Sequence, residues 1–498
     1  MFNHVKKAVC FSLALMMLAG SLIACGDSHS TPSDDTTPSN VAEGETKETL
    51  DIPSTRYDDQ ILTFLVRDGD DTWGTTEIYC EKITDKSDPF SAAVYERNLQ
   101  IYNDYGVTIE EIRKSATTHS ETIQREVLAP TNEFQAIVSD TTNLTSLTSA
   151  GALLDLNSYQ VEYLDFTKSW WDTKMAESMS INDHLYFATG DLLIDDNEAT
   201  FAMMFNKDLA KDYKLEDMYA LVNAGNWTLA KFYEMEQKVI HDAAGDGRLD
   251  YGVDTVGFAY TTDTAYCILF GSGITLCTKD ENDYPLYDLN IERTQNITDI
   301  GRRILANSCA LNLVTSDTDG VAYWDAGDIT FSNNKALFYA QCMNTVSGLR
   351  NYEVNFGILP FPKYDQAQPN YYSLMHCSSG ASFAIPRSVK TNDLPMITSM
   401  IEAMAYYAVD TLTEQYYEIN LKLKSAQDEQ SSPMIDLILA NRVYDLAYYY
   451  GWGNNAYTYL ADGLISGNSS SVASSNQRFK SLITKNIETL INDMDKLD

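Results

Sequence analysis

Short apolar runs alternate with longer amphipathic segments along most of this chain. The runs at 61–66, 107–112 and 134–138 have the length and composition of buried strands. The segments at 89–105 and 118–128, which lie between these runs, have helical spacing. Strands that are joined by helical crossovers form largely parallel sheets. The sequence therefore predicts an α/β fold.

Open α/β sheets bind ligands beyond the carboxyl ends of their strands. The loops at 67–74 and 139–145, which follow the first and third strands, are therefore the first candidates for a site. Sugar-binding surfaces stack aromatic faces on the ring and surround its hydroxyls with carboxylates and amides, and core packing is the alternative for any single tryptophan. The predicted ligand-binding residues combine these loops with other tryptophans near loops: Asp70, Trp73, Asp140, Asn143, Trp171, Trp324, Asp325 and Trp452.

Two clusters of tyrosine, at 406–407 and 448–450, are interpreted as aromatics that pack between helices. A degenerate calcium loop of EF-hand type is also present, with candidate oxygen ligands at Asp242, Asp246 and Asp250. An Asp/Gly turn is the alternative interpretation of this loop, because position three is Ala244 where a side-chain oxygen is expected. We therefore expect no required cofactor, with a structural Ca²⁺ as the one candidate.

The first residues have the features of an export signal, because two lysines precede an apolar stretch that is too short and too interrupted to span a bilayer comfortably. This stretch ends in Leu22-Ile23-Ala24-Cys25, which resembles a bacterial lipobox, in which the cysteine is diacylated. We expect residues 1–24 to be a signal peptide and Cys25 to carry a lipid, with an ordinary secretory signal as the alternative. Residues 25–56, rich in Ser, Thr, Pro, Asp and Glu, predict a disordered polar tether.

Composition and motifs exclude several classes of protein. With 71 acidic and 35 basic residues the formal net charge is −36, so the surface would repel nucleic acid. No H-E-x-x-H, P-loop, dinucleotide-binding or G-x-S-x-G motif occurs, and no C-x-x-C pair forms a zinc ribbon. We therefore expect no enzyme, although paired carboxylates keep an exported glycosidase open as an alternative. The cysteines that follow the tether are expected to be mainly buried thiols, although export permits disulfides.

A resemblance rests on the order and spacing of several short motifs. They are Gly151-x-Leu153-x-Asp155-Leu156, Phe205-Asn206-Lys207-x-Leu209, Gly225-Asn226-Trp227-Thr228, Phe331-x-Asn333-x-Lys335-Ala336-Leu337 and Gly357-Ile358-Leu359-Pro360-Phe361-Pro362-Lys363. Together with the lipobox and the tether, they resemble the extracellular solute-binding lipoproteins of bacterial ABC importers, in the maltose-binding-like cluster called family 1. The resemblance extends from about residue 57 to about residue 450.

This resemblance implies the periplasmic-binding-protein type II fold, in which two α/β lobes joined by a hinge close over a ligand. Transferred to this chain, it places the first lobe at 57–195 plus 380–430 and the second at 200–375 plus 431–498. The crossing segments are expected near 196–205 and 374–385.

The function implied is that of a monomeric, lipid-anchored protein on the outer face of a bacterial plasma membrane. It would capture a small solute, most simply a carbohydrate, and deliver it to an ABC permease, with no nucleic acid among its partners. The alternative on the same fold is a surface glycan-binding or sensory lipoprotein without transport.

Overall fold

The chain divides into two compact units, Met1–Lys47 and Glu48–Asp498. The structure, a computed structural model, describes residues 48–67, 77–80, 89–243, 245–318, 320–349, 352–417, 430–466 and 471–496, all in the second unit. The predicted signal peptide, the predicted lipidation site Cys25, and the candidate ligand residues Asp70 and Trp73 lie outside these residues. No helix among the described residues combines the length and apolarity needed to cross a membrane.

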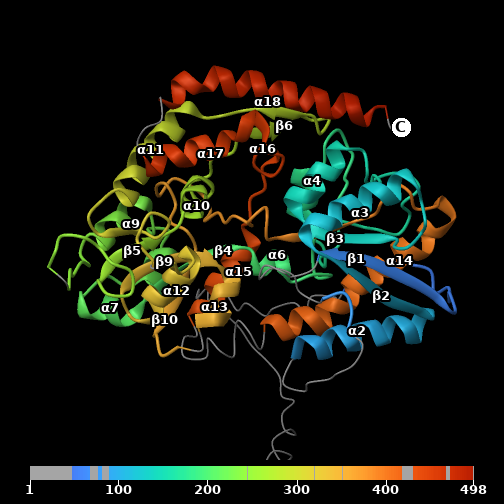
Figure 1. The fold of residues 1–498 in the computed structure, drawn as a ribbon, viewed down its shortest axis with the longest axis horizontal. Coiled ribbons are helices and arrows are strands. Elements are labelled where there is room, and N and C mark those ends of the chain that lie inside the picture. Colours follow the sequence, from blue (N-terminus) through green and yellow to red (C-terminus); the bar gives the residue numbers. More distant parts are fainter. Residues whose placement is uncertain are drawn as a thin grey trace, which may run out of the picture. The chain divides into compact units, whose positions relative to one another are not determined.

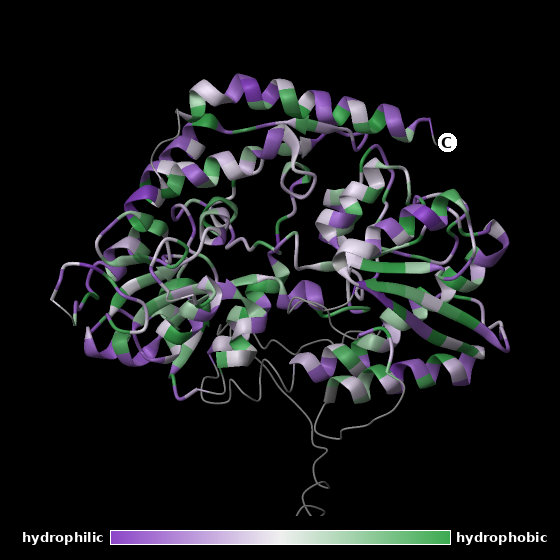
Figure 2. Cartoon of the chain, in the orientation of Figure 1, coloured by the Kyte–Doolittle hydropathy of each residue, from purple (hydrophilic) through white to green (hydrophobic). Residues whose placement is uncertain are grey.

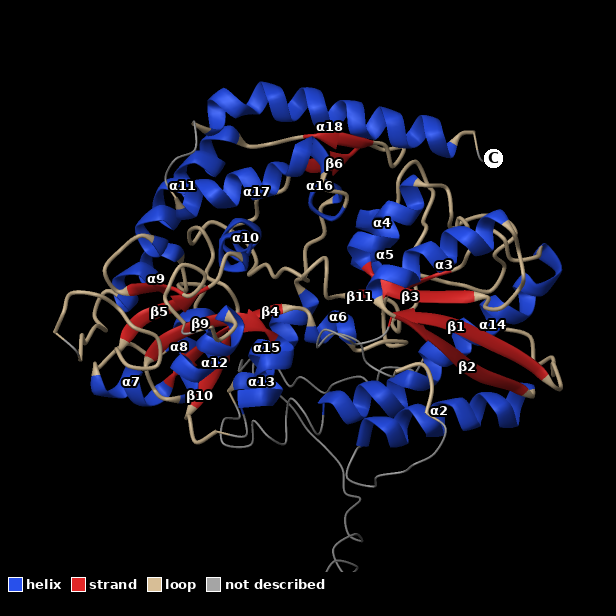
Figure 3. Cartoon of the chain, viewed as in Figure 1, coloured by secondary structure: helices blue, strands red, loops and turns tan. Residues whose placement is uncertain are grey.

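The first sheet has four strands in the order β11-β3-β1-β2. Figure 1 labels β1, β2 and β3, and Figure 3 labels β11 beside them. Its strands are β1 (Gln60–Arg67), β2 (Val107–Lys114), β3 (Ala136–Asp140) and β11 (Ala381–Ala384). β1 pairs in parallel with β2 and β3, whereas β11 pairs antiparallel to β3. The crossover helices are α2 (Pro89–Tyr105) and α3 (Ala116–Leu128), followed by α4 (Thr141–Ser149) after β3. The three strands and two helices predicted from the apolar periodicity are therefore confirmed.

The second sheet has five strands in the order β10-β4-β9-β5-β8. Its strands are β4 (Phe201–Asn206), β5 (Val256–Tyr260), β8 (Ala310–Asn312), β9 (Ala336–Cys342) and β10 (Phe356–Leu359). Each of the sheets is packed with helices, as Figure 3 shows. The helices of this part are α7 (Lys207–Asp212), α8 (Met218–Asn223), α9 (Leu229–Glu236), α10 (Asp263–Gly271), α11 (Ile291–Leu305), α12 (Tyr323–Ser332), α13 (Met343–Leu349) and α15 (Ser431–Ala440). Thr228 caps α9, because its side chain accepts a hydrogen bond from the Lys231 backbone N–H.

Two segments connect the sheets and lie side by side. One contains α6 (Asp195–Glu198) and leads into β4, and the other leads from β10 back to β11 in the first sheet. An isolated bridge joins Thr200 in the first segment to Met375 in the second. A second bridge joins Ser373 to Arg442, so the segment at 441–443 lies beside these two as a third. Four further helices are α5 (Thr173–Met179), η1 (Thr391–Asp393), α14 (Leu394–Ala408) and the π-helix η2 (Val409–Thr413), and α14 and η2 pack against α2.

The C-terminal helices pack beside the second sheet. They are α16 (Leu446–Tyr449), α17 (Trp452–Ile465) and α18 (Val472–Met494), and they lie near the small hairpin of β6 (Cys277–Lys279) and β7 (Pro285–Tyr287). Figure 2 shows that α18 alternates hydrophobic and hydrophilic residues along its length. Its buried residues include Phe479, Ile483, Ile487 and Leu490 at helical spacing, and this face packs on α17 and α11.

The six cysteines among the described residues are all free thiols. Cys267, Cys309 and Cys342 are buried, and the other three are half-buried, as expected for thiols that pack as small apolar side chains.

The compact unit begins at Glu48, earlier than the boundary expected at Tyr57. Leu50 and Ile52 pack against the core, and the Glu48 carboxylate accepts a hydrogen bond of 2.9 Å from the Ser169 backbone N–H. Sequence reasoning assigned these residues to the tether because their neighbours are polar, and isolated apolar residues carry no periodic signal.

A chain that starts at Tyr57 is therefore expected to be less stable than a chain that starts at Glu48. The loss of two partly buried aliphatic side chains should cost about 1–3 kcal/mol of unfolding free energy. Urea denaturation of the two chains measures this difference, and a third chain that starts at Glu48 with Leu50→Ala and Ile52→Ala separates packing from length. Equal midpoints for all three chains would contradict this packing.

Candidate ligand-binding site

The candidate site is a cleft of about 400 Å³. Its lining comes from helices and loops that pack with the first sheet and from others that pack with the second. From the first sheet come the opening turns of α4, and from the second sheet comes the first turn of α10. The connecting segment at 376–378 and the α16–α17 region complete the lining. The lining residues are Thr142, Thr145, Ser146, Asp263, Tyr266, His376, Cys377, Ser378, Ala447, Tyr448, Tyr449, Tyr450, Gly451, Asn455, Tyr457 and Thr458. A cleft of this volume suits a small-molecule ligand.

Five tyrosines give the cleft an aromatic wall. The ring centroids of Tyr266 and Tyr448 are 5.6 Å apart, and those of Tyr448 and Tyr457 are 5.5 Å apart, both edge to face. The backbone adopts the left-handed conformation at Gly451 and again over 453–455, which lets the chain turn from α16 into α17 beside the cleft. The sequence favours helix packing for the tyrosines at 448–450, and the structure shows that they are packed and also line the cleft.

Most hydroxyls of this wall are used inside the protein. The Tyr449 hydroxyl donates to the Met375 carbonyl oxygen at 2.9 Å, and the Tyr457 hydroxyl donates to the Asp445 carboxylate at 2.8 Å. The Tyr266 hydroxyl lies 3.1 Å from the Thr458 hydroxyl. These hydrogen bonds hold the rings in place. Tyr449 and Tyr457 are buried, so the half-buried Tyr266 and Tyr450 have the ring surface that a ligand can reach.

Asp263 and His376 face each other across the cleft, one from α10 and one from the connecting segment. The Asp263 Oδ1 to His376 Nε2 distance is 3.7 Å, and His376 Nδ1 lies 2.9 Å from the Ser379 hydroxyl. Sequence reasoning missed Asp263, although it follows β5 at a carboxyl strand end. The same rule that selected the loops of the first sheet would have found it in the second.

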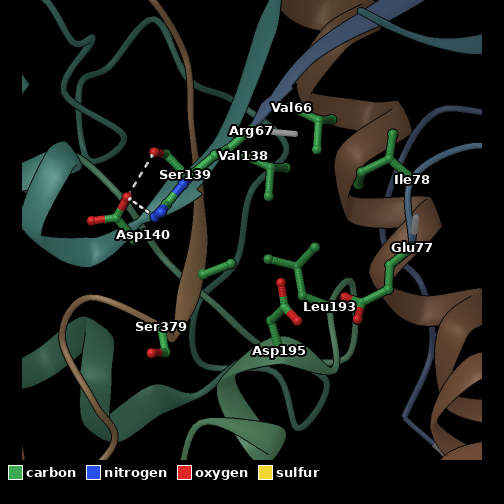
Figure 4. A pocket seen from close by; sticks show the side chains of 11 residues that line it. Val66, Arg67, Glu77, Ile78, Val138, Ser139, Asp140, Leu193, Asp195 and Ser379 are labelled. Carbon is green, nitrogen blue, oxygen red and sulfur yellow. Dashed lines mark hydrogen bonds and ion pairs between the residues drawn. The ribbon is translucent and has the colours of Figure 1, made fainter. Parts of the chain in front are cut away.

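Asp140 is held by two interactions within the first sheet's own structure. It caps α4 by accepting a 2.9 Å hydrogen bond from the Asn143 backbone N–H, and its Oδ2 forms a 2.8 Å ion pair with Arg67 Nη1. Figure 4 shows this pair in a small pocket of about 20 Å³, room for a single water, with Glu77 and Asp195 opposite. Asp140 therefore stabilises the helix that lines the cleft.

Asn143 is also engaged within the first sheet's structure. Its side-chain amide donates to the Ser139 hydroxyl at 2.8 Å and lies 3.3 Å from His119 Nδ1. Burial lowers the pKa of His119 to about 4, so the ring is neutral at physiological pH. The structure thus places Asn143 beside the cleft, with its polar atoms directed to protein partners.

Two of the predicted tryptophans are buried. Trp171 is 4% exposed, and both its indole N–H and that of Trp170 donate to the Glu402 carboxylate, at 2.9 and 3.0 Å. Trp452 is 5% exposed and stacks on Tyr450 with centroids 5.1 Å apart. These two rings follow the core-packing alternative, although Trp452 supports a ring that lines the cleft.

Trp324 differs from the other two, because it is 48% exposed at the start of α12, next to Asp325. Its neighbour Tyr323 packs edge to face against it, with centroids 4.6 Å apart. Neither Tyr323, Trp324 nor Asp325 is among the residues that line the cleft. Among the predicted tryptophans in the described residues, Trp324 has the most free ring surface.

A second pocket, of about 300 Å³, lies at the connecting segments and shares no lining residue with the cleft. Its central residue is Arg442, which pairs with Asp172 at 2.7 Å and with Asp196 at 3.0 Å. Burial raises the pKa of Asp196 to about 6 and that of Asp191 to about 7. This pocket joins side chains of the first sheet's loops to those of α15, where the two halves meet.

The candidate calcium residues bond to their own loop. The Asp242 carboxylate accepts from the Gly247 backbone N–H at 2.8 Å, and the Asp246 carboxylate accepts from the Arg248 N–H at 2.9 Å. Within the described ranges, no group of three or more His, Cys, Asp or Glu side chains is arranged to hold a metal ion. The loop therefore has the bonds of the Asp/Gly turn, and calcium at Asp242, Asp246 and Asp250 stays a prediction.

No protein-family profile matches the chain, and no curated protein matches its sequence. Solved structures match its fold. A sugar transporter from Rhizobium etli, in an open conformation, has a TM-score of 0.55 at 14% identity and covers 84% of this chain and 98% of its own. The GacH receptor of Streptomyces glaucescens, solved unliganded and with acarbose, has a TM-score of 0.51 at 14% identity over 85% of this chain and 98% of its own. UgpB from Mycobacterium tuberculosis, in complex with glycerophosphocholine, has a TM-score of 0.50 at 15% identity over 81% and 96%.

These likenesses show the fold. The chain has the periplasmic-binding-protein type II fold, with two α/β parts joined by crossing segments, as the resemblance of its motifs implied. The matched structures are of binding proteins rather than enzymes.

Proposed function

We propose that this protein captures a small solute, a carbohydrate in the first instance, and delivers it to an ABC permease while a lipid on Cys25 anchors it outside the cell membrane. The observation that carries the proposal is the cleft of about 400 Å³ whose lining comes from both halves of the fold. The carbohydrate assignment is supported by the aromatic wall and the surrounding hydroxyl, amide and carboxylate groups. Solved binding proteins of the same fold, with bound acarbose among them, support it as well.

The mechanism follows from the position of the cleft. A solute that touches α4 on one side and α10 on the other gains contacts only when the two halves are close together. It therefore stabilises the closed form by its differential affinity for the two forms. The connecting segments then act as the hinge, and a permease that recognises the closed form receives loaded protein.

A thermal-shift panel of mono- and oligosaccharides, polyols and amino acids tests this proposal on the chain from Glu48 onward. A ligand at 100 times its Kd should add about 2.7 kcal/mol to the stability, which is a shift of a few degrees. Tyr266→Ala should weaken binding about tenfold, because it removes a half-buried ring from the wall of the cleft.

The matched control is Tyr159→Ala, a tyrosine that is 93% exposed and lies outside the cleft lining. It should bind like the unaltered protein in calorimetry. A panel without any shift would contradict solute capture. A ligand whose affinity is equally unaffected by both substitutions would show that it binds elsewhere.

A further inference from the structure

The fixed charge of the cleft is negative. Among the described residues that line it, Asp263 is the one carboxylate and His376 the one basic side chain, with neither lysine nor arginine. The Asp263 side chain is 29% exposed, and its 3.7 Å distance to His376 Nε2 is longer than a hydrogen bond. The carboxylate is therefore available to a ligand.

The uncharged part of the lining also favours a cation. Tyrosine rings carry negative charge on their faces, and a cation placed over such a face is attracted to it. Tyr449 and Tyr457 are buried, at 1% and 2% exposed, so the rings that a ligand can reach are those of the half-buried Tyr266 and Tyr450. The Tyr266 hydroxyl already lies 3.1 Å from the Thr458 hydroxyl, so Tyr266 offers ring surface more than a free donor. The lining contains a single side-chain amide, that of Asn455.

Three kinds of solute would find different partners here. An anionic group would meet a carboxylate and aromatic faces without a fixed cation. A neutral polyol would find acceptors but few donors that are not already used. An ammonium group would find both a carboxylate to pair with and ring faces to lie against.

We propose that the solute captured in this cleft carries an ammonium group, and that Asp263 is the residue that selects for it. This inference rests on the proposed function, because it takes the cleft to be the ligand site. It narrows the ligand from solutes in general to amines, such as an amino sugar or a quaternary ammonium compound.

Matched pairs of probes test the charge separately from the shape. The β-1,4-linked trimer of glucosamine and cellotriose differ only by an amine in place of a hydroxyl on each ring. Choline and 3,3-dimethyl-1-butanol differ only by a charged nitrogen in place of a carbon. Isothermal titration calorimetry is done in low salt, at a pH below the pKa of the sugar amines, because salt screens charge pairs.

In at least one pair, the charged member should bind about tenfold tighter than its neutral partner or better. Asp263→Asn should abolish this preference, and added salt should weaken it in the unaltered protein. Asp212→Asn is the matched control, because it makes the same change in net charge at an exposed position on α7. It should keep the preference in full, and circular dichroism melts should show all variants folded.

The outcomes separate this inference from the proposed function. Equal affinity within both pairs, or a preference that survives Asp263→Asn, overturns the ammonium inference but leaves solute capture intact. Preference for choline, without binding of either trimer, supports the inference and overturns the carbohydrate class. Binding of none of the four probes overturns the inference, and the wider solute panel then decides whether the cleft captures a solute at all.

Discussion

Replacing Arg442 with methionine is expected to lower the free energy of unfolding by about 3–5 kcal/mol. The guanidinium is 10% exposed and pairs with two carboxylates from different segments, Asp172 at 2.7 Å and Asp196 at 3.0 Å. It also donates to the Asn197 side-chain oxygen at 3.1 Å. Asp196 itself is 1% exposed, and its Oδ1 has no hydrogen-bond partner among the described residues. Without Arg442, two buried carboxylates lose their counter-charge.

The loss of unfolding free energy in Arg442→Met should depend on pH. Burial raises the pKa of Asp196 to about 6, with Arg442 opposing the rise, so loss of the arginine raises this pKa further. As the pH falls through that range the carboxyl becomes protonated, and the penalty for an unpaired charge disappears. The difference between variant and unaltered protein should therefore shrink in acid.

Urea denaturation across pH measures both effects. Adding Asp196→Asn to Arg442→Met should recover part of the lost stability, because it removes one of the unpaired charges. Arg387→Met serves as the control, since Arg387 is exposed and its change should be nearly neutral. If Arg442→Met lowers the free energy of unfolding by less than about 1 kcal/mol, the ion pairs of Arg442 are not what joins the two halves.

Glu236→Gln is expected to act in the opposite direction and stabilise the protein. Glu236 ends α9 with no exposed surface and accepts a hydrogen bond from the Asn307 side-chain amide, and its Oε2 has no hydrogen-bond partner in the described part of the chain. Burial raises the pKa of this carboxyl to about 9. In the unfolded chain its pKa returns to an ordinary value near 4.5.

The direction in which stability changes with pH follows from proton linkage. Between these two pKa values the folded protein holds a proton that the unfolded chain releases, so stability falls as the pH rises from about 4.5 to about 9. At neutral pH the penalty is on the order of 3 kcal/mol, since each pKa unit is worth about 1.4 kcal/mol. Glutamine keeps the shape of the neutral acid and has no proton to lose.

The variant should therefore be more stable than the unaltered protein at neutral pH and equal to it near the ordinary pKa of glutamate. Melting curves over this pH range check the prediction. Glu126→Gln is an opposite control, because that carboxylate accepts hydrogen bonds from the backbone N–H groups of Thr131 and Asn132, and its loss should destabilise. A stability gap for Glu236→Gln that does not change with pH would contradict the linkage.

The sequence predicted the first sheet well, for a local reason. Strands β1 and β3 are apolar runs that end at a charged residue, Arg67 and Asp140, whereas β2 shows the alternation of buried and exposed residues at its start. Thr228 was identifiable as a cap from its place before a helical pattern. Leu50 and Ile52 were not predicted to pack, because two aliphatic residues in a polar stretch have no period to detect.

The candidate site was predictable as a location but not residue by residue. The rule that ligands bind at carboxyl strand ends led to Asp140 and Asn143, which lie beside the cleft with their polar atoms bonded to protein partners. The tyrosines at 448–450 line the cleft, although nothing in their local sequence separates packing from binding. Burial of Trp171 depends on Glu402, more than two hundred positions along the chain.

The sequence by itself determined the alternation of strands and helices, and hence the α/β class, because periodicity and capping act over a few neighbouring residues. It also set the net charge of −36, from which we expect no nucleic acid among the partners. Only the tertiary structure decided which polar groups are free for a ligand. Arg67 pairs with Asp140, and Glu402 accepts hydrogen bonds from two indoles, whereas Asp263 keeps a partly exposed carboxylate in the cleft. Some polar side chains form hydrogen bonds with partners that are distant in the sequence, and others do not. A local sequence pattern cannot predict which, because it contains no information on those distant partners.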